Sequence, residues 1–263
     1  MERDRQIVCH LGHAASLSRL SFSPGSHHGR LKMKIEIPVR KLTEWLAIIT
    51  VALNGIGFTG RAVEHYLGYK EHSQFVRLFH VADEANMTSF FSSLLLLFSA
   101  ILLALIARWK SGLGDPFKRH WAILSGIFFY ICLDEACAIH EITIKPLRSL
   151  FGATGFFYYS WVIIAIPLLI LLAVMYFRFV FSLPPKTRLI VIVAGSLFVS
   201  GALGFEMLGG YYQDKKVGNL DIYPFLITIE ELLENVGIVV FIYGLTSYMK
   251  SLPNLKEILI EFE

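Results

Sequence analysis

The feature that most constrains this chain is a run of 23 residues without a charged side chain, from Ala85 to Ala107. A helix of about 20 apolar residues is long enough to cross the hydrocarbon core of a bilayer. The chain is 55% hydrophobic and only 17% charged, whereas soluble domains carry roughly 25% charged residues. The sequence therefore predicts an all-α, multi-pass membrane protein, a bundle of six transmembrane helices. We expect the spans at about 45–66, 85–107, 121–141, 156–177, 189–209 and 223–249.

Three regions follow from this pattern. Residues 1–32 are polar, lack periodicity and lack the apolar segment of a secretory signal, so we expect a disordered leader. Met33 is an alternative start, in which case the leader belongs to an over-extended reading frame. Residues 33–250 form the six-helix transmembrane domain, and 251–263 form a short amphipathic cytoplasmic tail.

The basic residues predict an orientation. Six spans place both termini on one side of the membrane, where we count twelve Lys and Arg residues near the span ends, against seven on the other side. The positive-inside rule places the termini in the cytoplasm, in the cell (inner) membrane. The net charge of +3 is too small and too scattered to indicate a nucleic-acid partner. The four Trp residues lie near span ends, where we expect interfacial anchors; they are Trp45, Trp109, Trp121 and Trp161.

Ionisable residues gather at one end of the predicted bundle. The third span ends with Asp134, Glu135, His140 and Glu141, and we expect Pro146 to end any further helix. The fifth span contains Glu206, and the sixth begins with three acids, Glu230, Glu231 and Glu234. Further ionisable residues end the first span and precede the second: Glu64, His65, His80, Asp83 and Glu84. Because successive spans alternate in direction, all of these groups fall at the outer end of spans 1, 2, 3, 5 and 6. Such groups are costly inside a membrane, which makes them candidates for a functional site.

Helical periodicity predicts that these acids face the interior of the bundle. Each residue of an α-helix is rotated by about 100° from the one before it, and this rotation places three sets of residues on shared helix faces. The sets are Asp134, Ala138 and Glu141; Gly195, Ala202, Glu206 and Gly210; and Glu230, Glu234, Gly237 and Gly244. Carboxyl groups thus share faces with small residues, which is typical of closely packed helix interfaces in membranes.

A group of carboxylates in the bundle must be neutralised by protons or by bound cations. Carboxylates and imidazole from facing helices are the ligands of metal sites in helical bundles. We expect a divalent metal ion (zinc, iron or manganese) bound by Asp134, His140, Glu141, Glu206 and Glu234, with Glu135 or Glu230 as the catalytic base. The corresponding reaction is hydrolysis or oxidation of a lipid-like substrate. The Glu-x-x-His spacing of di-iron bundles is absent.

Three alternatives remain open from the sequence. A cation- or proton-coupled transporter would use the same acids as its ion site, although six spans are few for a transporter that does not form a homo-oligomer. A structural membrane partner would need no catalytic activity. In the third alternative, the acids are hydrated at the outer surface of the membrane, pair with basic residues such as Arg61 and Lys145, and take part in no chemistry. Whether the chain is an enzyme is therefore undecided by its sequence.

Three motifs resemble those of an uncharacterised family of multi-pass membrane proteins from bacteria and archaea. They are Leu-Asp-Glu-Ala with His-Glu (133–141), Glu-Ala-Asn before a Leu-rich run (84–97), and Glu-Glu-x-x-Glu-x-x-Gly (230–237). The resemblance covers about residues 40–250. It implies a six-helix membrane domain with shared acidic positions, and it implies no activity.

Overall fold

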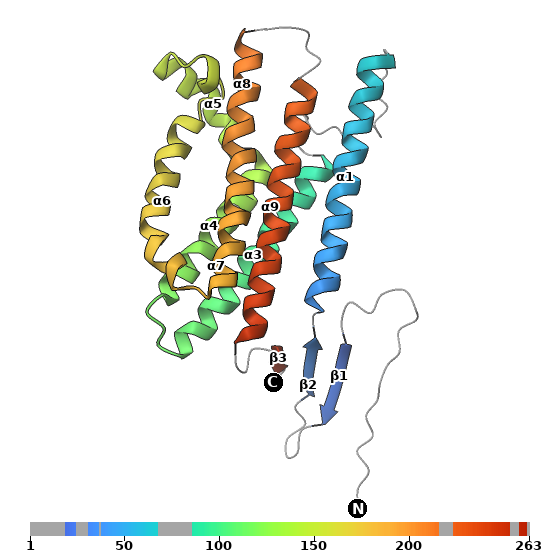
Figure 1. The fold of residues 1–263 in the computed structure, drawn as a ribbon, viewed down its shortest axis with the longest axis vertical. Helices are drawn as coiled ribbons and strands as arrows, with labels where there is room; N and C mark the ends of the chain where they lie inside the picture. Colours follow the sequence, from blue (N-terminus) through green and yellow to red (C-terminus); the bar gives the residue numbers. More distant parts are fainter. Residues whose placement is uncertain are drawn as a thin grey trace, which may run out of the picture.

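The computed structural model describes residues 19–24, 31–36, 38–67, 86–215, 223–252 and 258–261, without the side chains of 19–24, 31–36, 61–67, 224 and 258–261. Its body is a bundle of helices that run along one long axis (Figure 1). The helices are α1 (Val39–Leu67), α3 (Met87–Gly112), α4 (Lys118–Cys137), α5 (Ile139–Phe151), α6 (Val162–Ser182), α7 (Pro185–Val199), α8 (Glu206–Lys215) and α9 (Tyr223–Ser251). A short 3-10 helix, η1 (Gly155–Phe157), precedes α6, and a π-helix, η2 (Ser200–Phe205), joins α7 to α8.

The helical fold class is confirmed, but the number of helices in the described residues differs from the six predicted spans. Counting the continuous α7–η2–α8 as one, the described residues form seven helices. The seventh is α5, because the third predicted span breaks at Ala138 and a new helix begins, with Pro146 inside it rather than after it. At ~1.5 Å per residue, α5 is only about 20 Å long, too short to cross a bilayer.

Five described helices are long and apolar enough to cross a membrane. They are Val39–Gly60 within α1, Met87–Gly112, Lys118–Cys137, Val162–Ser182 and the continuous Pro185–Lys215. α9 is not one of the five, yet it lies at the centre of the bundle, where it packs against α1, α3, α7, η2 and α8. The first residues of α1 and the last of α9 lie at the same end (Figure 1).

Local sequence sets the limits of α3 and α4. Asn86 precedes α3, and its Oδ1 accepts hydrogen bonds from Thr88 N at 2.7 Å and Ser89 N at 2.9 Å, which satisfies two amides of the first turn. Asp115 joins the two helices: its Oδ2 pairs with Lys110 Nζ at 2.8 Å and its Oδ1 accepts from Phe117 N at 2.8 Å. This turn makes α3 and α4 an antiparallel hairpin.

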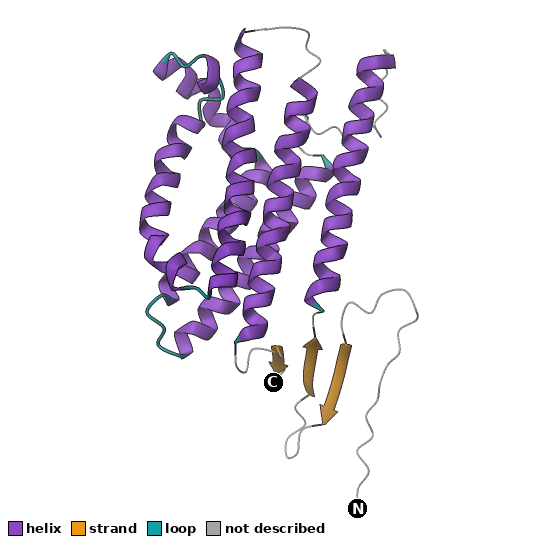
Figure 2. Ribbon diagram, in the orientation of Figure 1, coloured by secondary structure: helices purple, strands orange, loops and turns teal. Residues whose placement is uncertain are grey.

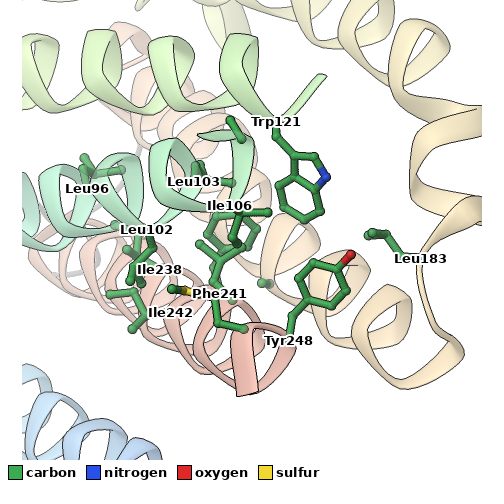
Figure 3. Close-up of a cluster of buried hydrophobic side chains, with 14 of the residues drawn as sticks. Leu96, Leu102, Leu103, Ile106, Trp121, Leu183, Ile238, Phe241, Ile242 and Tyr248 are labelled. Atoms are coloured by element: carbon green, nitrogen blue, oxygen red, sulfur yellow. The ribbon is translucent and has the colours of Figure 1, made fainter. Parts of the chain in front are cut away.

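The apolar core lies between α3, α4 and α9 (Figure 3). Leu103, Ile106 and Ile242 are completely buried in it. Trp121 is only 2% exposed, and its ring stacks on Tyr248 with centroids 5.4 Å apart. Trp121 therefore packs inside the bundle, contrary to its predicted role as an interfacial anchor. α6 lies at the periphery and exposes many large apolar side chains, including Leu168, Val174 and Phe177, as expected for a helix that faces lipid.

Three short strands lie outside the helices (Figure 2). They are β1 (Arg19–Pro24), β2 (Leu31–Glu36) and β3 (Ile258–Glu261), and they form one antiparallel sheet in the order β1-β2-β3. The sheet joins part of the predicted leader to part of the predicted tail. Both segments therefore lie at the end of the bundle where α1 begins (Figure 1).

Candidate functional site

A break in the chain at Ala138 places His140 against Asp134. Ala138 adopts a left-handed conformation with φ 49°, and its amide donates to the Asp134 backbone oxygen. Residues other than glycine rarely adopt this conformation, but here the Asp134 side chain holds the turn. Its Oδ1 accepts from His140 N at 2.8 Å, and its Oδ2 bonds to His140 Nδ1 at 2.9 Å. One carboxylate thus caps α5 and orients the imidazole.

Trp161 continues the polar contacts from His140 to Glu206. The Trp161 and His140 rings lie with centroids 5.0 Å apart, and Trp161 Nε1 donates to Glu206 Oε1 at 2.8 Å. The Glu206 side chain also interacts with that of Glu230 on α9. Two ionised carboxylates placed in this way would repel each other. The contacts therefore run from α4 through α5 and the residue before α6 to α8 and α9.

The π-helix η2 brings Glu206 to this position. A π turn holds about one residue more than an α turn, so η2 rotates the residues after it relative to α7. Before the π-helix, Ala194 and Phe198 face α9, where a Cβ added at Gly237 would lie 2.9 Å from Ala194 O and 2.8 Å from Phe198 N. The extra residue in η2 then lets Glu206 approach α9 as well.

Gly201, inside η2, allows the closest approach of the two helices. A Cβ added there would lie 2.7 Å from Glu230 O and 2.8 Å from Glu234 Cγ. Only a residue without a side chain fits this contact. The prediction that Gly195 shares an interior face with Glu206 is therefore wrong: a Cβ added at Gly195 meets no atom within 4 Å, because α-helical spacing does not hold through the π-helix.

Two further carboxyl groups complete the site. The charge of Glu234 interacts with those of Glu231, Glu135, Glu206 and Asp134, and the charge of Glu135 interacts with those of His140 and Asp134. We use the name acidic cluster for the six side chains of this group that were candidates from the sequence: Asp134, Glu135, His140, Glu206, Glu230 and Glu234. It combines five carboxyl groups with one imidazole, from α4, α5, α8 and α9.

The described residues give the acidic cluster no Lys or Arg partner. Four ion pairs are found in this part of the chain, and the one that involves the cluster joins His140 to Asp134. Burial alone would lower the pKa of His140, but the hydrogen bond to Asp134 and the neighbouring negative charges raise it above 6.5. A protonated His140 offsets one carboxylate, and the remaining negative charge needs protons or other cations.

A pair of tyrosines lies next to the cluster. The hydroxyl oxygens of Tyr159 and Tyr223 are 2.6 Å apart, and Tyr159 interacts electrostatically with Glu206 and Glu230. Burial and the hydrogen bond to Tyr223 raise the pKa of Tyr159, so its hydroxyl stays neutral. The Tyr159 ring fits closely against Gly210, where an added Cβ would lie 3.1 Å from the ring.

Of the seven candidate residues predicted from sequence, the structure brings six together. The seventh, Glu141, is exposed on α5, because the break at Ala138 takes it off the face it would share with Asp134 in a continuous helix. Among the described residues, no group of three or more His, Cys, Asp or Glu side chains is arranged to hold a metal ion. The expected contributions of Glu64, His65, His80, Asp83 and Glu84 lie outside the described side chains.

Sequence reasoning missed Trp161 and the tyrosine pair. Trp161 had the position of an interfacial anchor, yet its indole donates to a cluster carboxylate. Its place directly before an apolar helix gave no indication of this bond. The signal that was available is the concentration of aromatic residues in 156–161, which exceeds what anchoring requires.

Comparison with known proteins identifies a family. Residues 45–248 match the family described as Domain of unknown function (DUF8692). The chain belongs to this uncharacterised family, as the resemblance of its motifs suggested. No curated protein and no solved structure matches the chain.

Proposed function

We propose that this chain is a six-span protein of the cell membrane, with its termini in the cytoplasm, that binds and releases protons at the acidic cluster. α9 would be the sixth span. It has 29 residues, enough to cross a bilayer, and helices of spanning length and composition surround it. Because α9 faces protein rather than lipid, its acids do not have to contact hydrocarbon.

The observation that carries this proposal is that Glu206 and Glu230 interact closely, while the ion pairs of the described residues give neither of them a Lys or Arg partner. Two ionised carboxylates in this arrangement repel each other, so a proton bound to one of them would stabilise the pair. Such a proton can be exchanged when the surroundings change. Buried carboxyl groups that gain and lose protons are the coupling sites of proton-driven membrane transporters.

The resulting class of protein is a cation- or proton-coupled transporter. The acidic cluster lies near one end of the bundle, where α4, α5, α8 and α9 each contribute side chains to it. Six spans are few for a complete transport path, so this function favours assembly as a homo-oligomer. The transported molecule is not specified by the side chains of the cluster.

Infrared spectroscopy of the purified protein tests the proposal. A protonated carboxyl group has a C=O stretch distinct from that of a carboxylate, and we expect this band at neutral pH in the wild type. Glu230→Gln should remove it, because the amide replaces the group that carries the proton. Glu141→Gln is the matched control: Glu141 is exposed on α5, so its replacement should leave the band unchanged. A wild-type protein without the band would refute the proposal.

A second candidate function is metal-dependent hydrolysis or oxidation of a lipid-like substrate, and the Asp134–His140 pair favours it. Metal-ligating histidines commonly donate their other ring nitrogen to a carboxylate, and His140 Nδ1 bonds to Asp134 Oδ2 in this way. Nε2 then remains for zinc, iron or manganese, with Glu206 and Glu234 as further ligands and Glu135 or Glu230 as base. In this arrangement Asp134 orients the ligand, and the carboxylates must move to coordinate the ion.

Metal-dependent stability tests the second candidate. A divalent ion that binds only the folded protein stabilises it by about 2.7 kcal/mol at a concentration of 100 times its Kd. If the metal site exists, zinc, iron(II) or manganese(II) should raise the melting temperature of the wild type but not of His140→Ala. Equal shifts in the two proteins would refute binding at this site.

A further inference from the structure

Two buried oxygen atoms outside the acidic cluster have no hydrogen-bond partner among the residues that the structure describes. They are Asn54 Oδ1 on α1 and Thr88 Oγ1 on α3. Asn54 is 3% exposed and Thr88 is fully buried. The Asn54 amide nitrogen is satisfied, since it donates to Thr50 O at 3.0 Å. Buried polar atoms in native proteins almost always have a partner, which is often an ordered water molecule.

The position of Asn54 along the bundle follows from a ring contact. Phe58 on α1 packs against Phe225 on α9 with centroids 5.3 Å apart. The two helices run in opposite directions (Figure 1). The residue four positions before Phe58 on α1 therefore lies at about the same height as the residue four positions after Phe225 on α9. Asn54 is thus level with Ile229.

The position of Thr88 follows from a hydrogen bond. Ser92 Oγ on α3 donates to Asn235 Oδ1 on α9 at 2.9 Å. α3 and α9 run in the same direction, so Thr88, one turn before Ser92, lies level with Glu231. This is within one helical turn of the level of Asn54. The two unpartnered atoms therefore lie at one height, on the two helices that flank α9 on this side and contact each other.

We propose that an ordered water molecule binds between α1, α3 and α9 and donates hydrogen bonds to Asn54 Oδ1 and Thr88 Oγ1. An amide oxygen only accepts, so the occupant must be a donor, and a water molecule can donate to both atoms at once. An apolar occupant would leave both oxygens unsatisfied.

A double-mutant cycle in thermal unfolding tests the water site. Thr88→Val keeps the shape of the side chain and removes the hydroxyl, and Asn54→Leu removes the amide oxygen. If one water binds both, each substitution lowers the melting temperature by a few degrees, and the double variant loses clearly less than the sum, because the water is lost only once.

Ser99→Ala is the matched control for the cycle. Ser99 is fully buried on α3, and its hydroxyl bonds to Leu95 O in its own helix at 2.9 Å, so its loss should add to that of Asn54→Leu. The inference is overturned if Thr88→Val raises the melting temperature or leaves it unchanged, or if the two losses add. If Asn54→Leu does not fold, the change in melting temperature caused by Thr88→Val alone tests the water site: a decrease supports it, and an increase or no change overturns it.

The infrared band separates this inference from the proposed function. A protein that keeps its protonated-carboxyl band but shows additive losses refutes the water site alone. A protein without the band but with a non-additive cycle refutes the proton-binding function and keeps the water site.

Discussion

Replacing Gly201 with alanine should separate α9 from η2 and disturb the acidic cluster. The added Cβ would lie 2.7 Å from Glu230 O, whereas ordinary contacts begin at 3.4 Å, so the helices must move apart by about 0.7 Å. The contact is with backbone, which cannot turn away as a side chain can. Overpacking of this kind typically costs about 1–3 kcal/mol.

Gly204→Ala is the control, in the same π-helix. A Cβ added at Gly204 meets no atom within 4 Å, so this substitution keeps only the gain in helix propensity, about 1 kcal/mol. Because both variants share that gain, their difference isolates the cost of the clash. At about 2–4 °C per kcal/mol, the melting temperature of Gly201→Ala should lie about 2–12 °C below that of Gly204→Ala.

Thermal unfolding in detergent, followed by tryptophan fluorescence, measures the difference, and the infrared carboxyl band reports on the cluster. We expect Gly201→Ala to weaken this band and Gly204→Ala to preserve it, because only the first displaces the backbone of Glu230. Equal melting temperatures for the two variants would refute the close approach of α9 and η2.

Two further predictions concern the ends of the bundle. In a chain without its native cysteines, an impermeant thiol reagent applied to intact cells should label Lys215→Cys and leave Ser111→Cys unlabelled; the reverse result would place the acidic cluster on the cytoplasmic side. The turn between α3 and α4 should weaken in acid: burial alone would raise the pKa of Asp115, but the hydrogen bonds from Lys110 and Phe117 lower it below 3.8. The stabilisation by this turn is therefore complete above pH 3.8 and is lost as the pH falls through the lowered pKa of Asp115. Asp115→Asn should remove this part of the acid dependence of the melting temperature. An unchanged acid dependence in Asp115→Asn would contradict the role of the turn.

The helical fold was predictable because apolar run length and charge spacing determine where a chain can cross a bilayer. The limits of the third span were not predictable, because they depend on a single left-handed residue. Position 138 is an alanine rather than a glycine, so the sequence does not indicate a left-handed residue there. The turn is held by the Asp134 side chain, whose role depends on the position of His140 in the folded protein. The same break explains why Pro146 sits inside a helix.

The members of the acidic cluster were largely predictable, but their mutual geometry was not. Alternating span directions suffice to bring Asp134, Glu206 and Glu234 to one end. The angular position of Glu206 depends on η2, and a π-helix has no clear signature in sequence. The bond from Trp161 to Glu206 likewise exists only because two helices separated by 45 residues in sequence meet.

Elemental analysis of the purified protein tests most directly whether protons or bound metal ions neutralise the acidic cluster. The measurement is the number of zinc, iron and manganese ions per chain in the wild type, prepared without chelators, beside Glu206→Gln and Glu230→Gln. The proton-binding account predicts no stoichiometric metal in any of the three. One or more ions per wild-type chain, lost in both variants, would contradict it and establish the cluster as a metal site.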